Sequence, residues 1–442
     1  MVDNTLALLS QGYAWLPDLS RRQGPGPVRT RLLGRPALAL RGPAAVAFFY
    51  DERHVRRRAA LPEPVLSTLF GQGAVHTLDG EEHRARKAVF VSLLKDPSGV
   101  AALARRVAEE WQRSREQWAE RSEVTLFDEV SVLITRAVCA WAGVPQSVRT
   151  DAEAQETARD LVAMIDGFAT AGPRYWRARR ARRRQEERLA RAVEEARAPA
   201  AGEPDAARDG AAEQGPAAGP HTVLRAVAEH RDADGTLLDP RTAAVEILNV
   251  IRPTAAVTWY AVFGAHALHR HPELRTRLAK EGDDYARAFA HEVRRFYPFA
   301  PFVAGLAAGD VDWHGEPIAE DTLVLLDLYG QNHDPGLWRE PYAFDPERFT
   351  GREPGRDELV PQGGGEAAQG HRCPGEDVTL AILTALLPRL ARLDYEVPEQ
   401  DLRIPLRRVP TRPRSGFVIA QVRPPDPSEA LGDRESTEPE DE

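Results

Sequence analysis

The residue with the clearest chemical signature in this sequence is Cys373, which follows a glycine-rich stretch and precedes an expected helix. The chain reads Pro361-Gln-Gly-Gly-Gly-Glu-Ala-Ala-Gln-Gly-His-Arg-Cys-Pro-Gly-Glu376 and then becomes an apolar helical run, Val378–Leu393. A proline directly after the cysteine suits a first helical turn. The partial positive charge at a helix N-terminus favours thiolate over thiol, and His371 and Arg372 add positive charge or hydrogen-bond donors. Cys373 is therefore a candidate functional thiolate.

The chain has two cysteines, Cys139 and Cys373, in different settings. They cannot make a disulfide scaffold, and there is no CxxC pair for zinc. Cys139 lies inside an apolar helical segment, and we interpret it as an inert core residue. For Cys373, the neighbouring residues leave three interpretations open: an inert core cysteine, a nucleophile with a histidine partner, or a thiolate ligand to haem iron.

A second unusual group is Arg252, which is followed by Pro253 in the middle of an apolar helical run, Thr242–Leu268. A buried guanidinium is costly unless it is paired. Glu246 lies six residues earlier, on another side of the helix, and cannot neutralise Arg252 directly. The proline removes a backbone amide, so we expect a kink. Either Arg252 pairs with a carboxylate elsewhere in the chain, or its partner arrives with a substrate.

Helical periodicity dominates the elements that must position these groups, which predicts a mainly α fold with minor sheet. A helical run begins near Gly42, and longer helices are expected over Val100–Ser122, Leu126–Gly143, Ala152–Ala171, Arg174–Arg197, Thr242–Leu268 and Tyr285–Phe296. Strands are expected within Val28–Leu40 and over Val311–Trp313, Leu323–Leu328, Leu402–Ile404 and Gly416–Val422.

The composition is that of an ordinary globular chain. Its 442 residues include 58 basic and 67 acidic side chains, for a formal net charge of −9. The length allows a sizeable core. Met1 leads into Asp3 and Asn4 without the basic start and apolar run of a secretory signal. There is no uninterrupted apolar stretch of about 18 residues. We therefore predict a cytoplasmic protein with no membrane partner.

The basic segment Arg174–Arg197, which includes Tyr175 and Trp176, could suggest nucleic-acid binding. Its arginines alternate with glutamates such as Glu186 and Glu187, and the chain as a whole is not basic. We interpret the segment as a solvated helix face and predict no nucleic-acid partner.

Two segments are poor in the apolar residues that a fold needs. Residues 198–220 are rich in Ala, Gly, Pro and charge, and we predict a flexible loop there. From Asp426 to Glu442 there are eight acids and one base, Arg434, within a tail, 423–442, that we predict to be disordered.

Three motifs follow one another in the second half of the chain. Glu292 and Arg295 form a Glu-x-x-Arg pair whose spacing puts both on one helix face. Tyr342-Ala-Phe-Asp-Pro-Glu-Arg-Phe349 supplies another arginine, Arg348, and ends 24 residues before Cys373. Alone, the pair is common on solvated helices, but the ordered set is specific.

This set resembles the cytochrome P450 superfamily, over roughly Gly12 to Val422. The resemblance implies one haem domain over 1–422: a large helical domain with a small β-rich subdomain, and haem between a long distal helix and the cysteine loop. It gives Glu292, Arg295 and Arg348 a structural role in holding that loop. Cys373 then becomes the proximal ligand of haem iron.

The same resemblance implies which residues bind the cofactor, haem b. In Asp79-Gly-Glu-Glu-His-Arg-Ala-Arg-Lys87, a histidine and a base four positions later share one helix face. Family members use this pair for the haem propionates, which here means His83 and Lys87, with His371 and Arg372 from the cysteine loop. Without that context, His83 and Lys87 could equally be surface residues.

Two departures from an ordinary member point to a particular branch. The position seven residues before the cysteine holds Glu366 instead of Phe in a lengthened loop, which argues against a standard surface for an electron-transfer partner. Arg252-Pro253 replaces the usual acid and threonine of the distal helix. This pair, with Gln362-Gly-Gly-Gly and the Gly370–Glu376 segment, resembles the bacterial fatty-acid peroxygenases.

In that branch the mid-helix arginine binds the fatty-acid carboxylate bidentately, as a planar guanidinium can. The bound carboxylate moves a proton between the oxygens of hydrogen peroxide, so no redox partner is required. The match assigns catalytic roles to Arg252, Pro253 and His76. It implies a substrate pocket formed, besides Arg252, by Phe70, Ile165, Phe168, Ala256, Phe299 and Phe302, each of which alone could equally be simple core. A histidine at the position of His76 occurs in members that decarboxylate fatty acids.

We therefore expect a haem-thiolate peroxygenase that hydroxylates long-chain fatty acids at the α or β carbon with hydrogen peroxide, with possible decarboxylation to terminal alkenes. One alternative is a conventional monooxygenase that depends on redox partners and uses Arg252 for another anionic substrate. Another is a haem- or fatty-acid-binding protein without activity.

Overall fold

The computed structural model describes residues 2–24, 26–168, 170, 172–198 and 222–423. The loop predicted over 198–220 and the tail predicted over 423–442 lie outside the described residues, except for Ala198 and Arg423. Among the described helices, none is long and apolar enough to cross a membrane.

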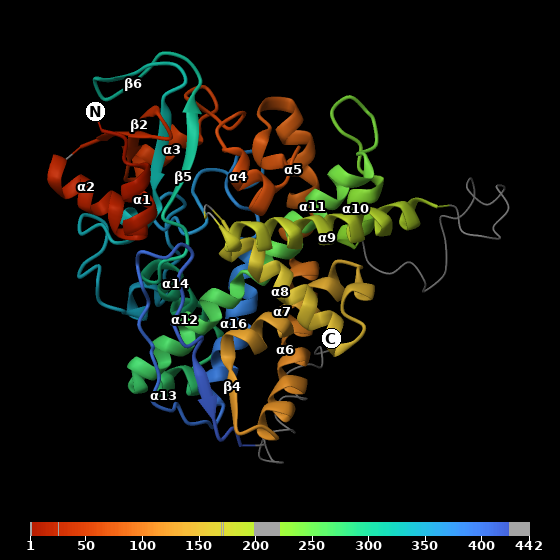
Figure 1. The fold of residues 1–442 in the computed structure, drawn as a ribbon. Helices are drawn as coiled ribbons and strands as arrows, with labels where there is room; N and C mark the ends of the chain where they lie inside the picture. Colours follow the sequence, from red (N-terminus) through yellow and green to blue (C-terminus); the bar gives the residue numbers. More distant parts are fainter. Residues whose placement is uncertain (1, 25, 169, 171, 199–221, 424–442) are drawn as a thin grey trace, which may run out of the picture.

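Helices form the larger part of the molecule, and most of the long ones, though not α6, pack against α11 or α12 (Figure 1). They are α1 (Thr5–Gln11), α2 (Trp15–Gln23), α3 (Pro43–Tyr50), α4 (Glu63–Val65), α5 (Gly80–Leu94), α6 (Pro97–Ala119), α7 (Leu126–Trp141), α8 (Asp151–Asp166), α9 (Pro173–Arg197), α10 (Val223–Glu229), α11 (Pro240–Ala255), α12 (Val257–Arg270), α13 (Pro272–Lys280), α14 (Asp283–Phe296), α15 (Leu328–Asn332) and α16 (Glu376–Arg392). The predicted long helices other than Thr242–Leu268 are confirmed, with boundaries shifted by a few residues.

Strands form a small subdomain beside the helices, as predicted. The main sheet has the order β1-β2-β8-β5-β3, with β2 parallel to β8 and the other neighbours antiparallel. Two further pairs are β4 with β9 and β6 with β7. The strands are β1 (Val28–Leu32), β2 (Arg35–Leu40), β3 (Val55–Arg56), β4 (Glu123–Thr125), β5 (Phe302–Ala307), β6 (Val311–Trp313), β7 (Glu316–Ile318), β8 (Leu323–Asp327) and β9 (Val418–Ala420).

Two of the sheet predictions need correction. No strand forms over Leu402–Ile404. The amides of Arg414 and Ser415 donate to the carbonyls of Arg403 and Asp401, but no regular ladder of hydrogen bonds continues from these two, and Pro405 follows the segment. Strands β3, β4, β5 and β7 were not expected; β5, whose sequence does not alternate, lies between β8 and β3.

The central helix is interrupted where Pro253 predicts a kink. Helix α11 begins after Asp239, whose carboxylate accepts from the amides of Arg241 and Thr242. It ends at Ala255, and α12 starts at Val257, so the two share only the boundary residue Ala256. The amide of Ala256 donates to the carbonyl of Arg252 and closes the last turn of α11. The predicted single helix is therefore two helices, and Arg252 lies just before the break.

The predicted solvated face of α9 includes Arg183 and Arg184, which are exposed and pair with acids on α8 and α9, but Arg182 does not belong to it. The side chain of Arg182 is buried and donates to the carbonyls of Leu69 (2.6 Å) and Phe70 (2.9 Å). Arg182 falls in the inward-facing stripe of α9, at helical spacing with Ala178 and Leu189.

Candidate functional site

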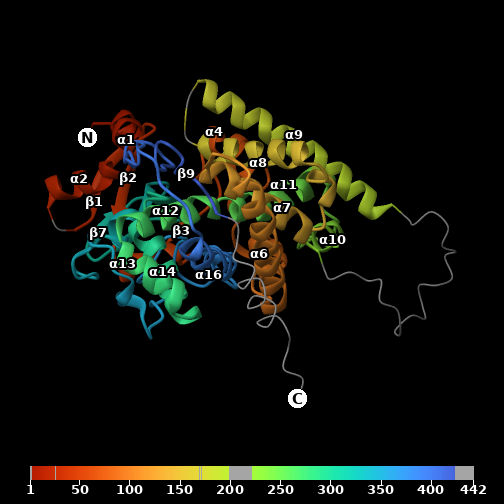
Figure 2. The same ribbon diagram turned by 90° about the horizontal axis from the view of Figure 1, so that it is seen from below.

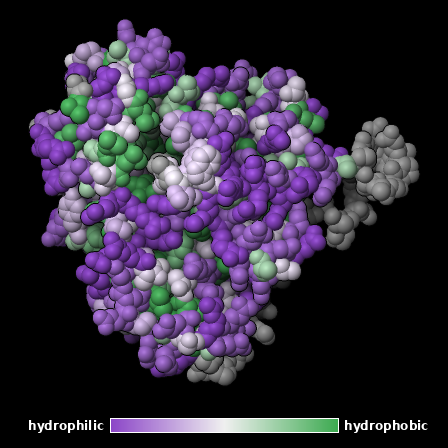
Figure 3. Space-filling model, viewed as in Figure 1, coloured by the Kyte–Doolittle hydropathy of each residue, from purple (hydrophilic) through white to green (hydrophobic). Residues whose placement is uncertain are grey.

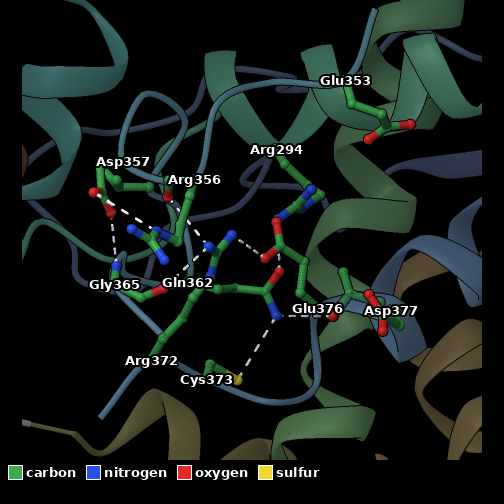
Figure 4. Close-up of polar contacts among 12 residues, drawn as sticks. Arg294, Glu353, Arg356, Asp357, Gln362, Gly365, Arg372, Cys373, Glu376 and Asp377 are labelled. Atoms are coloured by element: carbon green, nitrogen blue, oxygen red, sulfur yellow. Dashed lines mark hydrogen bonds and ion pairs between the residues drawn. The ribbon is translucent and has the colours of Figure 1, made fainter. Parts of the chain in front are cut away.

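The cysteine loop ends at the N-terminus of α16, with the sulfur of Cys373 next to the side chain of Gln362 (Figure 4). The Nε2 atom of Gln362 lies 4.0 Å from Sγ, and the backbone amide of Cys373 donates to the carbonyl of Gln362 at 3.4 Å. Glycines 363 and 365 have positive φ, and a side chain at either would collide with Tyr50 of α3. Glycine here therefore lets the loop pack directly on α3.

The carboxylate of Glu376, next to the cysteine loop, binds two arginines. Glu376 accepts from Arg294 of α14 and from Arg372, as Figure 4 shows, and Arg294 also donates to Oε1 of Gln362 at 3.0 Å. Arg372 further contacts two carbonyls of the loop region, at 3.2 and 3.4 Å. The predicted role of Arg372 in binding the cofactor remains a prediction.

Sequence reasoning missed Arg294 and Glu376 as parts of the site. Arg294 is fully buried next to Arg295. Burial alone would raise the pKa of Glu376, but the two guanidinium groups of Arg294 and Arg372 lower it to about 2. The available signal was a charged residue in the first turn of α16, directly after the cysteine motif.

Replacing Glu376 with Gln is expected to destabilise the protein at neutral pH, because Arg294 would lose its buried partner. A pKa lowered from 4.5 to about 2 corresponds to about 3 kcal/mol of stability that is complete above the normal pKa of a glutamate. That contribution is lost as the pH falls from about 4.5 through about 2. Urea unfolding of both proteins at pH 7 and pH 3 should show a difference that shrinks at the lower pH. An equal difference at both values would contradict this origin.

The predicted pair of Glu292 and Arg295 is confirmed as a buried, bidentate ion pair. Both hydrogen bonds are 2.7 Å long, and both residues are fully buried. Arg295 also donates to the carbonyls of Asn332, Pro341 and Ala343. Nε of Arg348 lies 3.6 Å from the Glu292 carboxylate. The three predicted structural residues are therefore brought together, and they hold the chain that leads to the cysteine loop.

The predicted propionate-binding residues lie together beside α5. The rings of His83 and His371 stack at 3.8 Å, and Nζ of Lys87 donates to the carbonyl of Arg372 at 2.6 Å. His83 and Lys87 are both buried, so they are not surface residues. Burial lowers the pKa of His83 to about 3 and that of Lys87 to about 8.

Two carboxylates that sequence reasoning missed flank this cluster. Nε2 of His371 lies 3.3 Å from Glu52 and 3.4 Å from Asp79. Glu52 comes from the turn after α3, so no pattern along the sequence links it to His371. Asp79 stands four residues before His83, where its carboxylate also accepts from two backbone amides.

On the other side of the site, Arg252 is buried without an anionic partner. Its Nη2 lies 3.4 Å from Oδ1 of Asn249, its Nε makes no hydrogen bond, and the guanidinium carbon lies 5.7 Å from the centre of the Phe70 ring. No carboxylate of the described residues lies within 4.0 Å of it. Burial lowers the pKa of Arg252 to about 9, so the group is still charged at neutral pH.

The prediction that Glu246 does not neutralise Arg252 is confirmed. The carboxylate of Glu246 is buried, accepts from Arg86 at 2.8 Å and from the amide of Val75 at 2.8 Å, and lies 3.4 Å from Asn249. It thus fixes the segment before His76 to α11, and it forms no ion pair with Arg252.

His76 lies beside the same arginine. Its ring is 4.5 Å from that of Phe70, and its Nδ1 makes no hydrogen bond. Burial first, and then the nearby charge of Arg252, hold the pKa of His76 well below its usual value. The imidazole is therefore neutral at physiological pH.

The contacts bring Phe70, His76 and Arg252 together directly, whereas the other predicted pocket residues approach from neighbouring elements. Ile165 is buried near the end of α8, Phe168 follows that helix, and Ala256 stands at the helix break. Phe299 lies 5.0 Å from Tyr260, and Phe302 lies 6.1 Å from Trp15 of α2. Their role in a shared pocket remains a prediction.

The family described as "Cytochrome P450" matches residues 264–418. Among curated proteins, cytochrome P450 76C4 of Arabidopsis thaliana is 35% identical over 123 residues, 26% of this chain and 23% of that protein. Cyclooctat-9-en-7-ol 5-monooxygenase of Streptomyces melanosporofaciens is 31% identical over 190 residues, 38% of this chain and 39% of that protein. The chain thus spans well under half the length of these curated relatives.

Solved structures match over nearly the whole chain. Cytochrome P450SP alpha (CYP152B1) in complex with (R)-ibuprofen is 40% identical, with a TM-score of 0.88 and coverage of 96% of this chain and 99% of that one. Cytochrome P450EX alpha (CYP152N1) with myristic acid is 33% identical, with a TM-score of 0.86 and coverage of 96% and 98%. A variant of cytochrome P450 OleT in complex with arachidonic acid is 34% identical, with a TM-score of 0.87 and coverage of 97% and 98%. The chain therefore belongs to the cytochrome P450 family, in its CYP152 branch.

Proposed function

We propose that this protein is a fatty-acid peroxygenase that uses hydrogen peroxide to hydroxylate long-chain fatty acids at the α or β carbon, with some decarboxylation to terminal alkenes. The observation that carries the proposal is the buried, charged Arg252, which has no carboxylate partner among the described residues. A fatty acid supplies the missing carboxylate. Structures of the CYP152 relatives with myristic and arachidonic acid support this choice of ligand.

The family implies a haem cofactor, and the residues present fit it. We propose haem b, with Cys373 as the axial ligand at the N-terminus of α16. The stacked imidazoles of His83 and His371 and the ammonium group of Lys87 offer donors for two propionates, and Nδ1 of His83 is buried without a hydrogen bond. When bound, haem supplies the redox chemistry that cleaves the O–O bond of peroxide and oxidises the substrate.

The residues of this chain position the substrate and its proton. The guanidinium of Arg252 binds both oxygens of the carboxylate, a geometry that its planar donors favour. The bound carboxylate then acts as acid and base toward peroxide. It replaces the acidic side chain that other family members carry in the distal helix and that Arg252-Pro253 replaces here. Because one end of the chain is fixed, only the α and β carbons come near the reacting centre.

The proposal requires no redox partner. Glu366 stands where most members carry Phe, and in this structure its exposed side chain pairs with Arg356 at the surface of the cysteine loop. We further propose that the enzyme acts in the cytoplasm.

The test is incubation of the purified, haem-loaded protein with myristic acid and hydrogen peroxide, without reductase, followed by gas chromatography–mass spectrometry. Hydroxy acids or tridecene are the expected products. Product formation only after NADPH and redox partners are added would instead indicate a monooxygenase that uses Arg252 for another anion. Tight fatty-acid binding without turnover would indicate a binding protein.

Replacing His76 with Gln is expected to lower the fraction of alkene among the products several-fold while total turnover stays within about three-fold. The neutral imidazole next to Phe70 can relay a proton or electron to the reacting substrate, and an amide cannot. The measurement is the ratio of alkene to hydroxy acids from one substrate. An unchanged ratio would remove His76 from the choice of product.

A further inference from the structure

Three arginines gather around Asp166 where α8 ends, two at its carboxylate and one at its backbone carbonyl. Nη2 of Arg408 lies 3.0 Å from the carboxylate of Asp166, and Nη1 of Arg412 lies 3.1 and 3.3 Å from its two oxygens. The guanidinium of Arg174 donates to the backbone carbonyl of the same residue. We call Asp166, Arg174, Arg408 and Arg412 the arginine cluster.

The arginine cluster carries more positive charge than its own acids neutralise. Two of its guanidinium groups, those of Arg408 and Arg412, lie within hydrogen-bond distance of its one carboxylate, and Asp128 acts on Arg412 only over a longer range. The arginines also repel one another, since Arg408 lowers the pKa of both Arg174 and Arg412, after burial as the main cause. Nε of Arg408 is buried and makes no hydrogen bond. Unmatched, partly buried guanidinium groups with a free donor are suited to an anion.

The arginine cluster lies next to the predicted pocket for the alkyl chain. Asp166 directly follows Ile165 on α8 and stands two residues before Phe168. The guanidinium carbon of Arg412 lies 3.9 Å from the centre of the Phe127 ring and 5.7 Å from that of Trp259, and Trp259 in turn contacts Phe299 at 6.4 Å.

Tyr13 provides a second link between the arginine cluster and the predicted pocket for the alkyl chain. Its hydroxyl donates to the carbonyl of Phe299 at 2.5 Å and also contacts the backbone of Thr411, the neighbour of Arg412. Figure 2 shows the C-terminal loops, in blue, between the N-terminal helices and the start of α9. In Figure 3, hydrophobic residues gather around a recess on the face between these same elements.

We infer that the arginine cluster is a second carboxylate-binding site, which receives the far end of a long-chain dicarboxylic acid whose first carboxylate is bound by Arg252. The inference rests on the proposed function, because it uses the same pocket. A fatty acid with one carboxylate leaves the arginine cluster unoccupied, whereas the second carboxylate of a diacid neutralises the excess positive charge of the cluster. In this proposal the diacid is held at both of its ends.

The test compares hexadecanedioic acid with hexadecanoic acid and with the monomethyl ester of the diacid, titrated into the haem-loaded protein and followed by the haem absorbance. The diacid should bind about ten-fold or more tightly than its monoester, because a charged end-group gains charge-assisted hydrogen bonds. Without the arginine cluster the order would be reversed, since a free carboxylate would be buried unpaired. Equal or weaker binding of the diacid overturns the inference and needs no variant.

The matching variant is Arg408→Gln, which keeps the size of the side chain and removes charge at the arginine with a free donor. It should weaken diacid binding about ten-fold and change hexadecanoic acid binding less than two-fold. Arg184→Gln is the control, because Arg184 pairs with Asp160 between the same two helices but outside the arginine cluster. Equal weakening of both acids in Arg408→Gln would mean a structural role. If hexadecanoic acid itself fails to bind the wild-type protein, it is the proposed function that fails.

Discussion

Replacing Arg252 with Ala is expected to lower peroxide-driven oxidation of myristic acid at least about 100-fold, while the protein still folds and binds haem. The loss is large because Arg252 holds the group that moves the proton of peroxide in the proposed mechanism, the carboxylate of the substrate itself. Loss of one positioned donor at a reacting centre typically costs 100- to 1,000-fold. Turnover without reductase and the haem-to-protein absorbance ratio are measured on the same samples. The variant should remain stable, since the arginine leaves no protein carboxylate behind when it is removed.

Arg252→Lys separates charge from geometry. A lysine keeps the positive charge but cannot offer two parallel donors, so we expect an intermediate activity. Near-normal turnover in Arg252→Ala would refute the substrate-assisted mechanism. Full activity in Arg252→Lys would show that charge alone is sufficient.

Replacing Glu292 with Ala is expected to prevent the recovery of a stable, haem-loaded protein. Arg295 would be left charged and fully buried, with carbonyl partners but no carboxylate within its bidentate pair. Removal of one partner from a buried ion pair typically costs about 3–5 kcal/mol. The change would also free the amide of Asp345, which donates to Glu292 at 2.8 Å. Haem content after purification and the midpoint of urea unfolding are the measurements.

Glu273→Ala is the control for this experiment. Glu273 is an exposed glutamate on α13, and its contact with His271 spans 3.5 Å at the surface. Its removal should change the free energy of unfolding by less than about 0.5 kcal/mol. A Glu292→Ala protein with normal haem content and stability would contradict the proposed structural role.

The sequence was sufficient for the parts of this protein that depend on short spacings. The 3.6-residue periodicity located the long helices, and Glu292 and Arg295 had to share a face because three residues separate them. Arg252 was recognisable because a charge in an apolar helix must find a partner. These arguments use only neighbours along one element.

Contacts between distant segments could not be predicted in this way. Glu52 reaches His371, and Arg408 reaches Asp166, from elements that carry no sequence signal for the pairing. The inward turn of Arg182 was also hidden, because the surrounding arginines on α9 look alike until the packing of that helix is known. The extended segment Leu402–Ile404 shows the converse, since an apolar stretch forms a strand only where a partner strand is available.

The order of strands in the main sheet has a consequence for how this protein is made. Strand β2 pairs with β8, so Ala37 cannot pair until Leu323 has been synthesised. Likewise, Tyr50 cannot pack against the cysteine loop until the glycines of that loop have been synthesised. Most of the helix-forming segments therefore emerge from the ribosome before either contact can form. Such distant pairings also close slowly. The newly made chain completes the site only near the end of synthesis, and we expect a nascent chain truncated before Leu323 to retain no haem.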